Sequence, residues 1–232
     1  MRLSRRQKVA AAAEAYRIMR TNLLVAISDI DRPTVMITSA MPGEGKTSTV
    51  ANLAPALALA GQRIVVVDLD LRHPDLHNAF GLPNDHGVAD VLRGDADLAD
   101  CMTYVGVEGD RGEAATGMYV LTSGPTMSDG SELISGRRCA RMLSALADQS
   151  DLVLIDSAPV LPVADTLSLA RMVAGVVLVV EARRTPLPAI QQAKDSLIRN
   201  QARLLGVVVN KLQATDTGTA SPGGQVASYA YP

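Results

Sequence analysis

The chain has 232 residues, of which 47% are hydrophobic and only 3% are aromatic, and its net charge is −2. This length suits one large domain with an aliphatic, alanine-rich core, and the near-neutral charge argues against a general nucleic-acid-binding protein, which usually has a clear basic excess. The longest apolar run, residues 172–180, is far shorter than the ~20 residues of a membrane span, and Cys101 and Cys139 lack metal-ligand spacing, so we expect a soluble, reduced cytosolic chain.

The first part of the chain is predicted to form a helix, a strand, a loop and a second helix. Apolar residues recur at helical spacing over residues 4–28, which predicts an amphipathic helix. A β-rich run over residues 34–39 leads into a glycine-containing loop, and residues 46–60 have the pattern of a helix that stops at Gly61. Pro55 lies inside this second helix and is expected to kink it.

The rest of the chain alternates between apolar runs and helical segments, with short helical pieces expected over residues 75–100. This alternation implies βαβ units and therefore an α/β fold of three layers, in which helices flank a mostly parallel central sheet. From residue 213 onward the sequence is rich in Gly, Ser and Thr, which predicts a disordered tail over residues 213–232. The predicted strands are 63–68, 118–122, 152–156, 175–181 and 204–210, and the longer helices are 131–149 and 187–201.

The run AMPGEGKT, from Ala40 to Thr47, matches the P-loop pattern with alanine at the first glycine position, and it follows a strand and precedes a helix. Gly43 and Gly45 let the backbone approach a phosphate, and the helix N-terminus adds partial positive charge. Lys46 is expected to reach the β- and γ-phosphates, and the Thr47 hydroxyl is expected to bind Mg²⁺. The sequence thus predicts a P-loop NTPase that binds ATP or GTP. The predicted loop residues are Pro42, Gly43, Glu44, Gly45, Lys46, Thr47 and Ser48.

Aspartates follow two of the predicted strands. Asp68 and Asp70 in VVVDLD are two residues apart, so they lie on the same side of an extended chain. Asp156 ends LVLID, which is the Walker B arrangement that holds Mg²⁺. Each motif alone also fits a solvated turn, with Arg72 neutralising the first pair, but together with the P-loop they favour a metal site. Asn210, at the end of the last strand, either hydrogen-bonds adenine or forms a simple turn.

In chain order, A-x-P-G-E-G-K-T, V-V-V-D-x-D-x-R and L-V-L-I-D-x-x-P resemble the motifs of the bacterial tyrosine kinases (BY-kinases) of capsule and exopolysaccharide synthesis. The second motif looks like the Walker A′ of that family, its most telling motif. The resemblance implies an ATP-dependent protein-tyrosine autokinase that regulates polysaccharide synthesis and export. Lys46, Asp68 and Asp70 would be catalytic, and Thr47, Asp70 and Asp156 would hold Mg²⁺. Asp68 would orient or deprotonate the tyrosine, although which of the two aspartates is the base stays open.

The resemblance also extends to both ends of the chain. Glu14, Arg17 and Arg20 match the E-x-x-R-x-x-R helix with which family members assemble rings, although the residues alone indicate only an exposed i,i+3 pair. Tyr229 and Tyr231 match the family's C-terminal acceptors, which a neighbouring subunit phosphorylates, although the family normally carries a larger cluster. The predicted division is therefore an N-terminal helix over 1–30, a P-loop kinase domain over 31–212, and a tyrosine-bearing tail over 213–232.

The predicted partners are other copies of the chain in a ring and a membrane-spanning activator or polysaccharide co-polymerase, with no nucleic acid. Through such a partner, or a membrane segment outside this sequence, we expect the cytoplasmic chain to lie at the inner face of the cell membrane. The alternative is a switch ATPase similar to the MinD/ParA group. Those proteins carry a signature lysine where this chain has Met41. An iron–sulfur scaffold ATPase would need a C-x-x-C motif, which Cys101 and Cys139 do not supply.

Overall fold

The computed structural model describes residues 5–108, 114–126 and 133–212. The bounds of its elements agree with most of the predicted ones to within a few residues. The strands are β1 (Thr34–Ser39), β2 (Ile64–Leu69), β3 (Met102–Glu108), β4 (Ala114–Leu121), β5 (Leu152–Ser157), β6 (Gly175–Glu181) and β7 (Leu204–Asn210). The helices are α1 (Arg5–Ala26), α2 (Lys46–Ala58), α3 (Leu76–Phe80), α4 (Val88–Arg93), α5 (Leu98–Cys101), α7 (Arg137–Gln149), α8 (Asp165–Ala170) and α9 (Leu187–Arg199).

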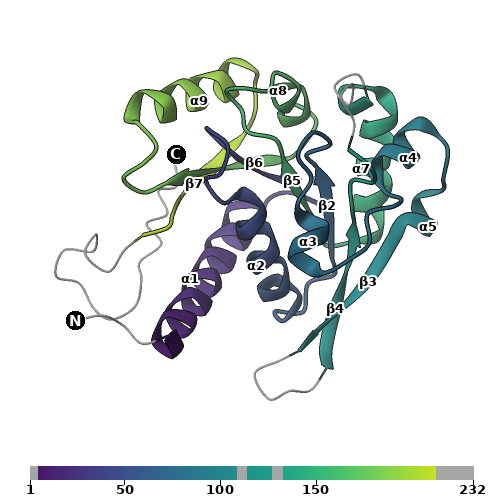
Figure 1. The fold of residues 1–232 in the computed structure, drawn as a ribbon, viewed down its shortest axis with the longest axis horizontal. Coiled ribbons are helices and arrows are strands. Elements are labelled where there is room, and N and C mark those ends of the chain that lie inside the picture. Colours follow the sequence, from purple (N-terminus) through teal and green to yellow (C-terminus); the bar gives the residue numbers. More distant parts are fainter. Residues whose placement is uncertain (1–4, 109–113, 127–132, 213–232) are drawn as a thin grey trace.

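One seven-stranded sheet runs through the molecule in the order β3-β4-β2-β5-β1-β6-β7 (Figure 1). Neighbouring strands are parallel throughout, except for the antiparallel pair β3 and β4 at one edge. Helices cover both faces, so every residue of β1, β2 and β5 is buried, as expected for central strands of a parallel sheet. The predicted three-layer α/β fold with a mostly parallel sheet is confirmed.

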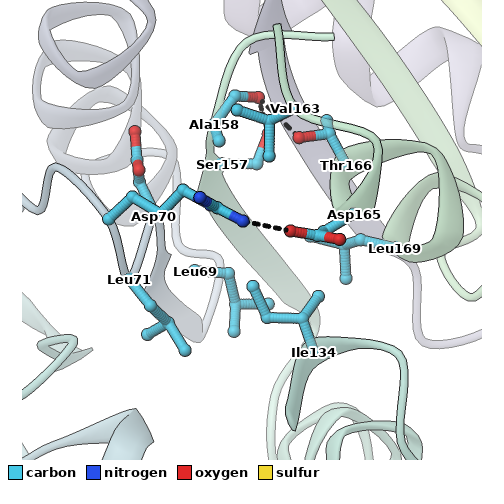
Figure 2. A pocket seen from close by; sticks show the side chains of 11 residues that line it. Leu69, Asp70, Leu71, Ile134, Ser157, Ala158, Val163, Asp165, Thr166 and Leu169 are labelled. Carbon is cyan, nitrogen blue, oxygen red and sulfur yellow. Dashed lines mark hydrogen bonds and ion pairs between the residues drawn. The ribbon is translucent and has the colours of Figure 1, made fainter. Parts of the chain in front are cut away.

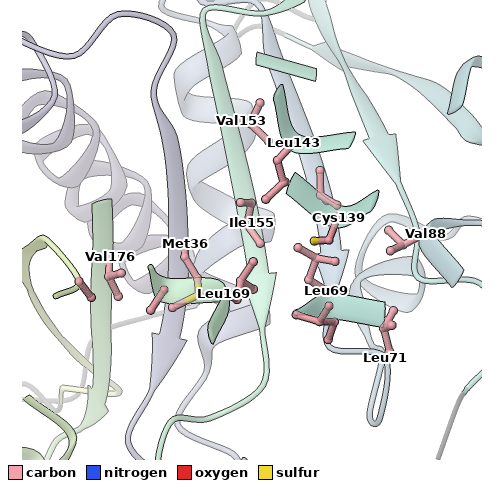
Figure 3. Packing of buried hydrophobic residues seen from close by; sticks show 14 of the residues in the cluster. Met36, Leu69, Leu71, Val88, Cys139, Leu143, Val153, Ile155, Leu169 and Val176 are labelled. Atoms are coloured by element: carbon pink, nitrogen blue, oxygen red, sulfur yellow. The ribbon is translucent and has the colours of Figure 1, made fainter. Parts of the chain in front are cut away.

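Two clusters of buried side chains fill the space between the sheet and the two helical layers. Alternate residues of each strand point to opposite faces, so Val35 and Ile37 enter the cluster beneath α1, α2 and α3, whereas Met36 enters the cluster beneath α4, α7, α8 and α9. Figure 3 shows Met36, Ile155 and Leu169 within this second cluster. In the described residues the fully buried core is aliphatic, as the composition indicates.

The structure differs from the predicted elements mainly near the edge of the sheet. β3 was not predicted, because only Val107 of its residues is buried and its burial does not alternate regularly. Pairing with β3 also extends β4 back to Ala114, four residues before the predicted start. Helix α7 begins at Arg137 rather than 131, after an extended Gly136. The short helix α8 was not predicted either.

Helix α1, which lies in the predicted N-terminal region 1–30, packs against α2. Met19, Leu23 and Ile27 are buried, and α1 lies along α2 (Figure 1). Pro55 lies within α2 without ending that helix. In the described parts of the chain, we find no helix whose length and apolar character would suffice to cross a membrane.

Replacing Leu53 by alanine should lower the free energy of unfolding by about 2–5 kcal/mol, because its fully buried side chain would leave a cavity between α2 and the sheet. Leu59 is 44% exposed at the end of the same helix, so Leu59→Ala should change stability by only about 0.5 kcal/mol. Urea unfolding of both variants measures the difference. Equal losses would contradict this account of the core.

Candidate active site

The P-loop connects β1 to α2 at the carboxyl ends of the parallel strands. Gly43 and Gly45 have φ angles of +79° and +94°, in the left-handed region that favours glycine. A side chain at Gly45 would also collide with Asn210, because an added Cβ would lie 2.1 Å from Asn210 Nδ2. Gly45 is the N-cap of α2, and glycine has no side chain that could occupy the N–H groups of the first turn. The predicted strand–loop–helix context is therefore present.

Lys46 joins the P-loop to the acidic ends of two strands. Its Nζ lies 2.8 Å from Asp70 Oδ2 and 3.8 Å from Asp156 Oδ1. The parallel register of β2 and β5 sets Asp68 directly opposite Asp156. Three predicted acids and the P-loop lysine, distant in sequence, thus form one cluster. Thr47 belongs to the same cluster, because Lys46 Nζ lies 3.4 Å from Thr47 Oγ1.

Burial and the charges of neighbouring groups shift the pKa values of the acids and of Lys46 in this cluster. Burial raises the pKa of Asp156 to about 6, although the charge of Lys46 opposes the shift. Burial, followed by the charge of Asp156, raises the pKa of Asp68 well above its usual value. For Lys46, burial lowers the pKa, but the charges of Asp156 and Asp70 outweigh it and leave the pKa raised. The site therefore favours a bound cation, which would compensate the acids.

Asp68 and Asp70 differ in what their carboxylates contact. Both oxygens of Asp68 accept backbone N–H groups, from Asp70 at 3.0 Å and from Leu76 at 3.1 Å. Asp70 accepts one backbone N–H, from His73 at 3.0 Å, through Oδ1 and pairs with Lys46 through Oδ2. It also lines a small, mainly apolar hollow between β2 and α8 (Figure 2). Arg72, beside this hollow, forms an ion pair with Asp165 at 3.2 Å. Asp68 thus shapes the loop after β2, and of these two aspartates only Asp70 lines the hollow.

The cluster fits the predicted Mg²⁺. Both oxygens of Asp156 are buried, and among the described residues neither has a hydrogen-bond partner. No group of three or more His, Cys, Asp or Glu able to hold a metal occurs in the described residues. Mg²⁺ commonly uses one or two carboxylates together with substrate phosphates, so Thr47, Asp70 and Asp156 suit an ion that nucleotide phosphates help to hold.

The side chains of Glu44 and Asn210, both predicted to bind nucleotide, form hydrogen bonds with other residues of this chain. The Glu44 carboxylate accepts hydrogen bonds from the Met41 N–H at 2.9 Å and from the Thr185 hydroxyl. Because its side chain is engaged in this way, we expect Glu44 to contact a nucleotide through its backbone N–H. Asn210 Nδ2 donates to the Glu44 carbonyl at 2.9 Å. Sequence reasoning missed Thr185 and also Lys211, which contacts the loop beside Asn210; neither belongs to a motif that could have revealed it.

The other predicted residues lie away from this cluster. Glu14 and Arg17 form an exposed ion pair at 3.1 Å on α1. Arg20 turns inward, and its Nη1 donates to the Ala56 carbonyl at the end of α2 at 3.2 Å. The predicted acceptors Tyr229 and Tyr231 lie outside the described residues, as does the predicted tail.

A P-loop between the first inner strand and its helix, with acids at the ends of β2 and β5, defines a nucleotide-binding P-loop domain. The model of the CobQ/CobB/MinD/ParA nucleotide-binding domain family matches residues 35–221.

Individual proteins with similar sequences and structures show to which family within this class the chain belongs. The tyrosine-protein kinase YwqD of Bacillus subtilis (strain 168) is 35% identical over 198 residues, covering 85% of this chain and 80% of YwqD. The solved kinase domain of the Escherichia coli tyrosine kinase ETK has a TM-score of 0.80 at 28% identity, covering 95% of this chain and 80% of that chain. The crystal structure of the chimerical protein CapA2B2 has a TM-score of 0.76 at 34% identity, covering 86% and 84%. The chain belongs to the bacterial tyrosine kinase family.

Not all relatives have the same length. At 30% identity, the chain spans 26% of the length of the curated Etk of Escherichia coli (strain K12), so it corresponds to one part of that longer protein.

Asp156→Asn should stabilise the nucleotide-free protein at neutral pH. The folded protein holds the Asp156 proton up to a pKa of about 6, whereas the unfolded chain releases it near 3.8. Between these values the native state binds more protons, so stability falls as pH rises through the window. Thermal unfolding with a chelator present, from pH 4 to pH 7, should show a smaller fall in the variant.

Asp151 is the matched control, because Arg63 hydrogen-bonds its carboxylate and lowers its pKa. Asp151→Asn should therefore destabilise at neutral pH. If Asp156→Asn also lowers the stability at neutral pH, the charge of Asp156 stabilises the fold and the prediction is wrong.

Proposed function

We propose that this chain is an ATP-dependent protein-tyrosine autokinase that phosphorylates C-terminal tyrosines of a neighbouring subunit and regulates capsule or exopolysaccharide synthesis and export. One observation carries the proposal: Lys46 of the P-loop contacts acids at the ends of both β2 and β5, in a chain of the tyrosine kinase family. The acid after β2 belongs to the D-x-D-x-R motif, which supports transfer to tyrosine over transfer to water.

In the proposed reaction the P-loop N–H groups and Lys46 hold the β- and γ-phosphates of ATP. Thr47, Asp70 and Asp156 would hold Mg²⁺, which when bound neutralises phosphate charge. The bond from the γ-phosphorus to the bridging oxygen of ADP breaks, and a bond to the phenol oxygen forms. The phenol proton passes to a carboxylate. Such transfers depend mainly on positioning and charge stabilisation, so no covalent enzyme intermediate is required.

The two acids of β2 are suited to different parts of this reaction. The raised pKa of Asp68, caused first by burial, makes its carboxylate a better proton acceptor than an ordinary aspartate. Both of its oxygens are nevertheless engaged by backbone N–H groups. Asp70 is as buried as Asp68, and its oxygens accept the His73 N–H and pair with Lys46, but of the two it is the one that lines the hollow of Figure 2. We assign proton uptake to this pair, with Asp68 orienting the loop that carries Asp70.

The acceptors and partners follow from family membership and the motifs at both ends of the chain. Tyr229 and Tyr231 are the proposed acceptors, presented to the active site of another copy. Glu14, Arg17 and Arg20 are the proposed contacts of the ring. A membrane-spanning activator or polysaccharide co-polymerase would hold the ring at the inner face of the membrane.

Incubation with Mg-ATP should produce phosphotyrosine at Tyr229 or Tyr231, because these are the proposed acceptors of a neighbouring active site. Lys46→Ala should abolish the product, since it removes the cation nearest the phosphates. Phosphosite mapping by mass spectrometry measures both, and a variant with Phe at both tail positions is the acceptor control. ATP hydrolysis without any phosphotyrosine would overturn the kinase proposal.

That outcome would favour the alternative, a switch ATPase similar to MinD. The matching family model includes MinD and ParA. Met41, at the position of the signature lysine of those proteins, is 43% exposed, so no cation reaches out of the loop from that position. This observation favours the kinase.

Changing Arg17 and Arg20 together to alanine should shift the oligomer toward the monomer in sedimentation velocity. The single variants separate two effects, because Arg17 is exposed whereas Arg20 also contacts the carbonyl of Ala56 within its own chain. Arg17→Ala should weaken assembly with little loss of thermal stability. An unchanged mass in the double variant would remove this surface from the interface.

A further inference from the structure

Asn210, the last residue of β7, and Lys211, which follows it, both contact the P-loop. Lys211 Nζ donates to the Gly43 carbonyl at 2.7 Å and pairs with Glu181 Oε2 at 2.9 Å. Asn210 Nδ2 donates to the next carbonyl, that of Glu44, at 2.9 Å. Two successive carbonyls of the loop are therefore bound by two successive residues at the end of β7.

These contacts fix the orientation of the N–H groups that a phosphate would need. The described peptide bonds are all trans, and in a trans peptide the N–H points opposite to the C=O. A carbonyl of Gly43 held by Lys211 turns the N–H of Glu44 to the other side, and the bond from Asn210 does the same for the N–H of Gly45. Successive N–H groups turned to one side form an anion-binding nest.

The carboxylate of Glu44 is kept out of this nest by a related contact. Its Oε1 accepts the Thr185 hydroxyl proton, and Thr185 Oγ1 in turn accepts the Glu181 N–H at 2.8 Å. Glu181 also holds Lys211, so the ends of β6 and β7 act on the loop together. The Glu44 carboxylate is thus held by Thr185 and by the Met41 N–H.

Lys211 adopts a conformation that lysine rarely takes. Its φ is +56°, in the left-handed region that disfavours residues with a Cβ. Such a conformation persists where the surrounding contacts over-determine it. Here the surrounding contacts are the Gly43 carbonyl and Glu181.

We propose that Lys211 is a positioning residue for the nucleotide: acting with Asn210, it holds the P-loop peptides so that their N–H groups face the phosphates, without touching the phosphates itself. The inference deepens the proposed function, because it rests on triphosphate binding at the same loop. It assigns to Lys211, two residues before the predicted tail, a control over nucleotide affinity.

Lys211→Ala should raise the dissociation constant of Mg-ATP about tenfold, the size expected for loss of one charge-assisted hydrogen bond. Titration of the full chain with a fluorescent ATP analogue measures it. Lys211→Arg keeps a cationic donor and should bind within about threefold of wild type. Arg184→Ala is the matched control, because Arg184 pairs with the same Glu181 at 3.4 Å but is 74% exposed; its affinity should be unchanged.

Lys211→Gly separates positioning from a merely structural role. Glycine relieves the left-handed strain, so this variant should unfold at a higher temperature than Lys211→Ala while binding Mg-ATP equally weakly. Affinity that followed thermal stability across the variants would overturn the proposal. So would wild-type affinity in Lys211→Ala, or an equal loss in Arg184→Ala.

The binding assay does not depend on phosphoryl transfer. If wild type binds Mg-ATP and Lys211→Ala binds it weakly, yet no phosphotyrosine forms, the kinase proposal fails and the positioning role stands. If phosphotyrosine forms and the affinities are equal, the positioning role fails alone.

Discussion

The contact between one nearly buried ammonium group and several buried carboxylates is the interaction on which the site depends. Parallel pairing of β2 and β5 brings Asp68 and Asp156 side by side in the core, an arrangement that is unfavourable for two charged acids away from water. Lys46 reaches both strand ends from the P-loop and offsets part of that repulsion. The loop, the two strand ends and the helix that begins at Lys46 are thereby held in one geometry.

Hydrogen bonds from residues outside the P-loop motif also fix the backbone of the P-loop. Its carbonyls contact side chains at the end of β7, and its single carboxylate bonds to the turn after β6. A loop shared by kinases and switch ATPases can therefore be tuned by residues outside its motif. On the proposed function, the acids at the ends of β2 and β5 would act on the γ-phosphate, whereas the contacts from β7 would act on nucleotide affinity through the loop peptides.

Most of the fold was predictable because the inner strands are buried on both faces and therefore appear as unbroken apolar runs, as in β2 and β5. The edge strand β3 lacked this signal, since its pairing with β4 and not its own burial makes it a strand. Within the site, the motifs predicted Lys46 and the three acids as one cluster. They did not predict that Glu44 and Asn210 would contact the loop itself, because nothing in sequence spacing encodes which carbonyls lie within reach.

The sequence by itself determined the class of the protein: the P-loop, the two acidic strand ends and their order along the chain identify a phosphate-binding α/β domain of the tyrosine kinase family. Only the tertiary structure decided which acid faces the hollow, that Arg20 turns toward α2, and that Lys211 holds Gly43. The physical reason is that motifs encode local backbone geometry and residue chemistry, whereas these contacts join segments up to 168 residues apart. Their distances depend on how the whole sheet and its helices pack.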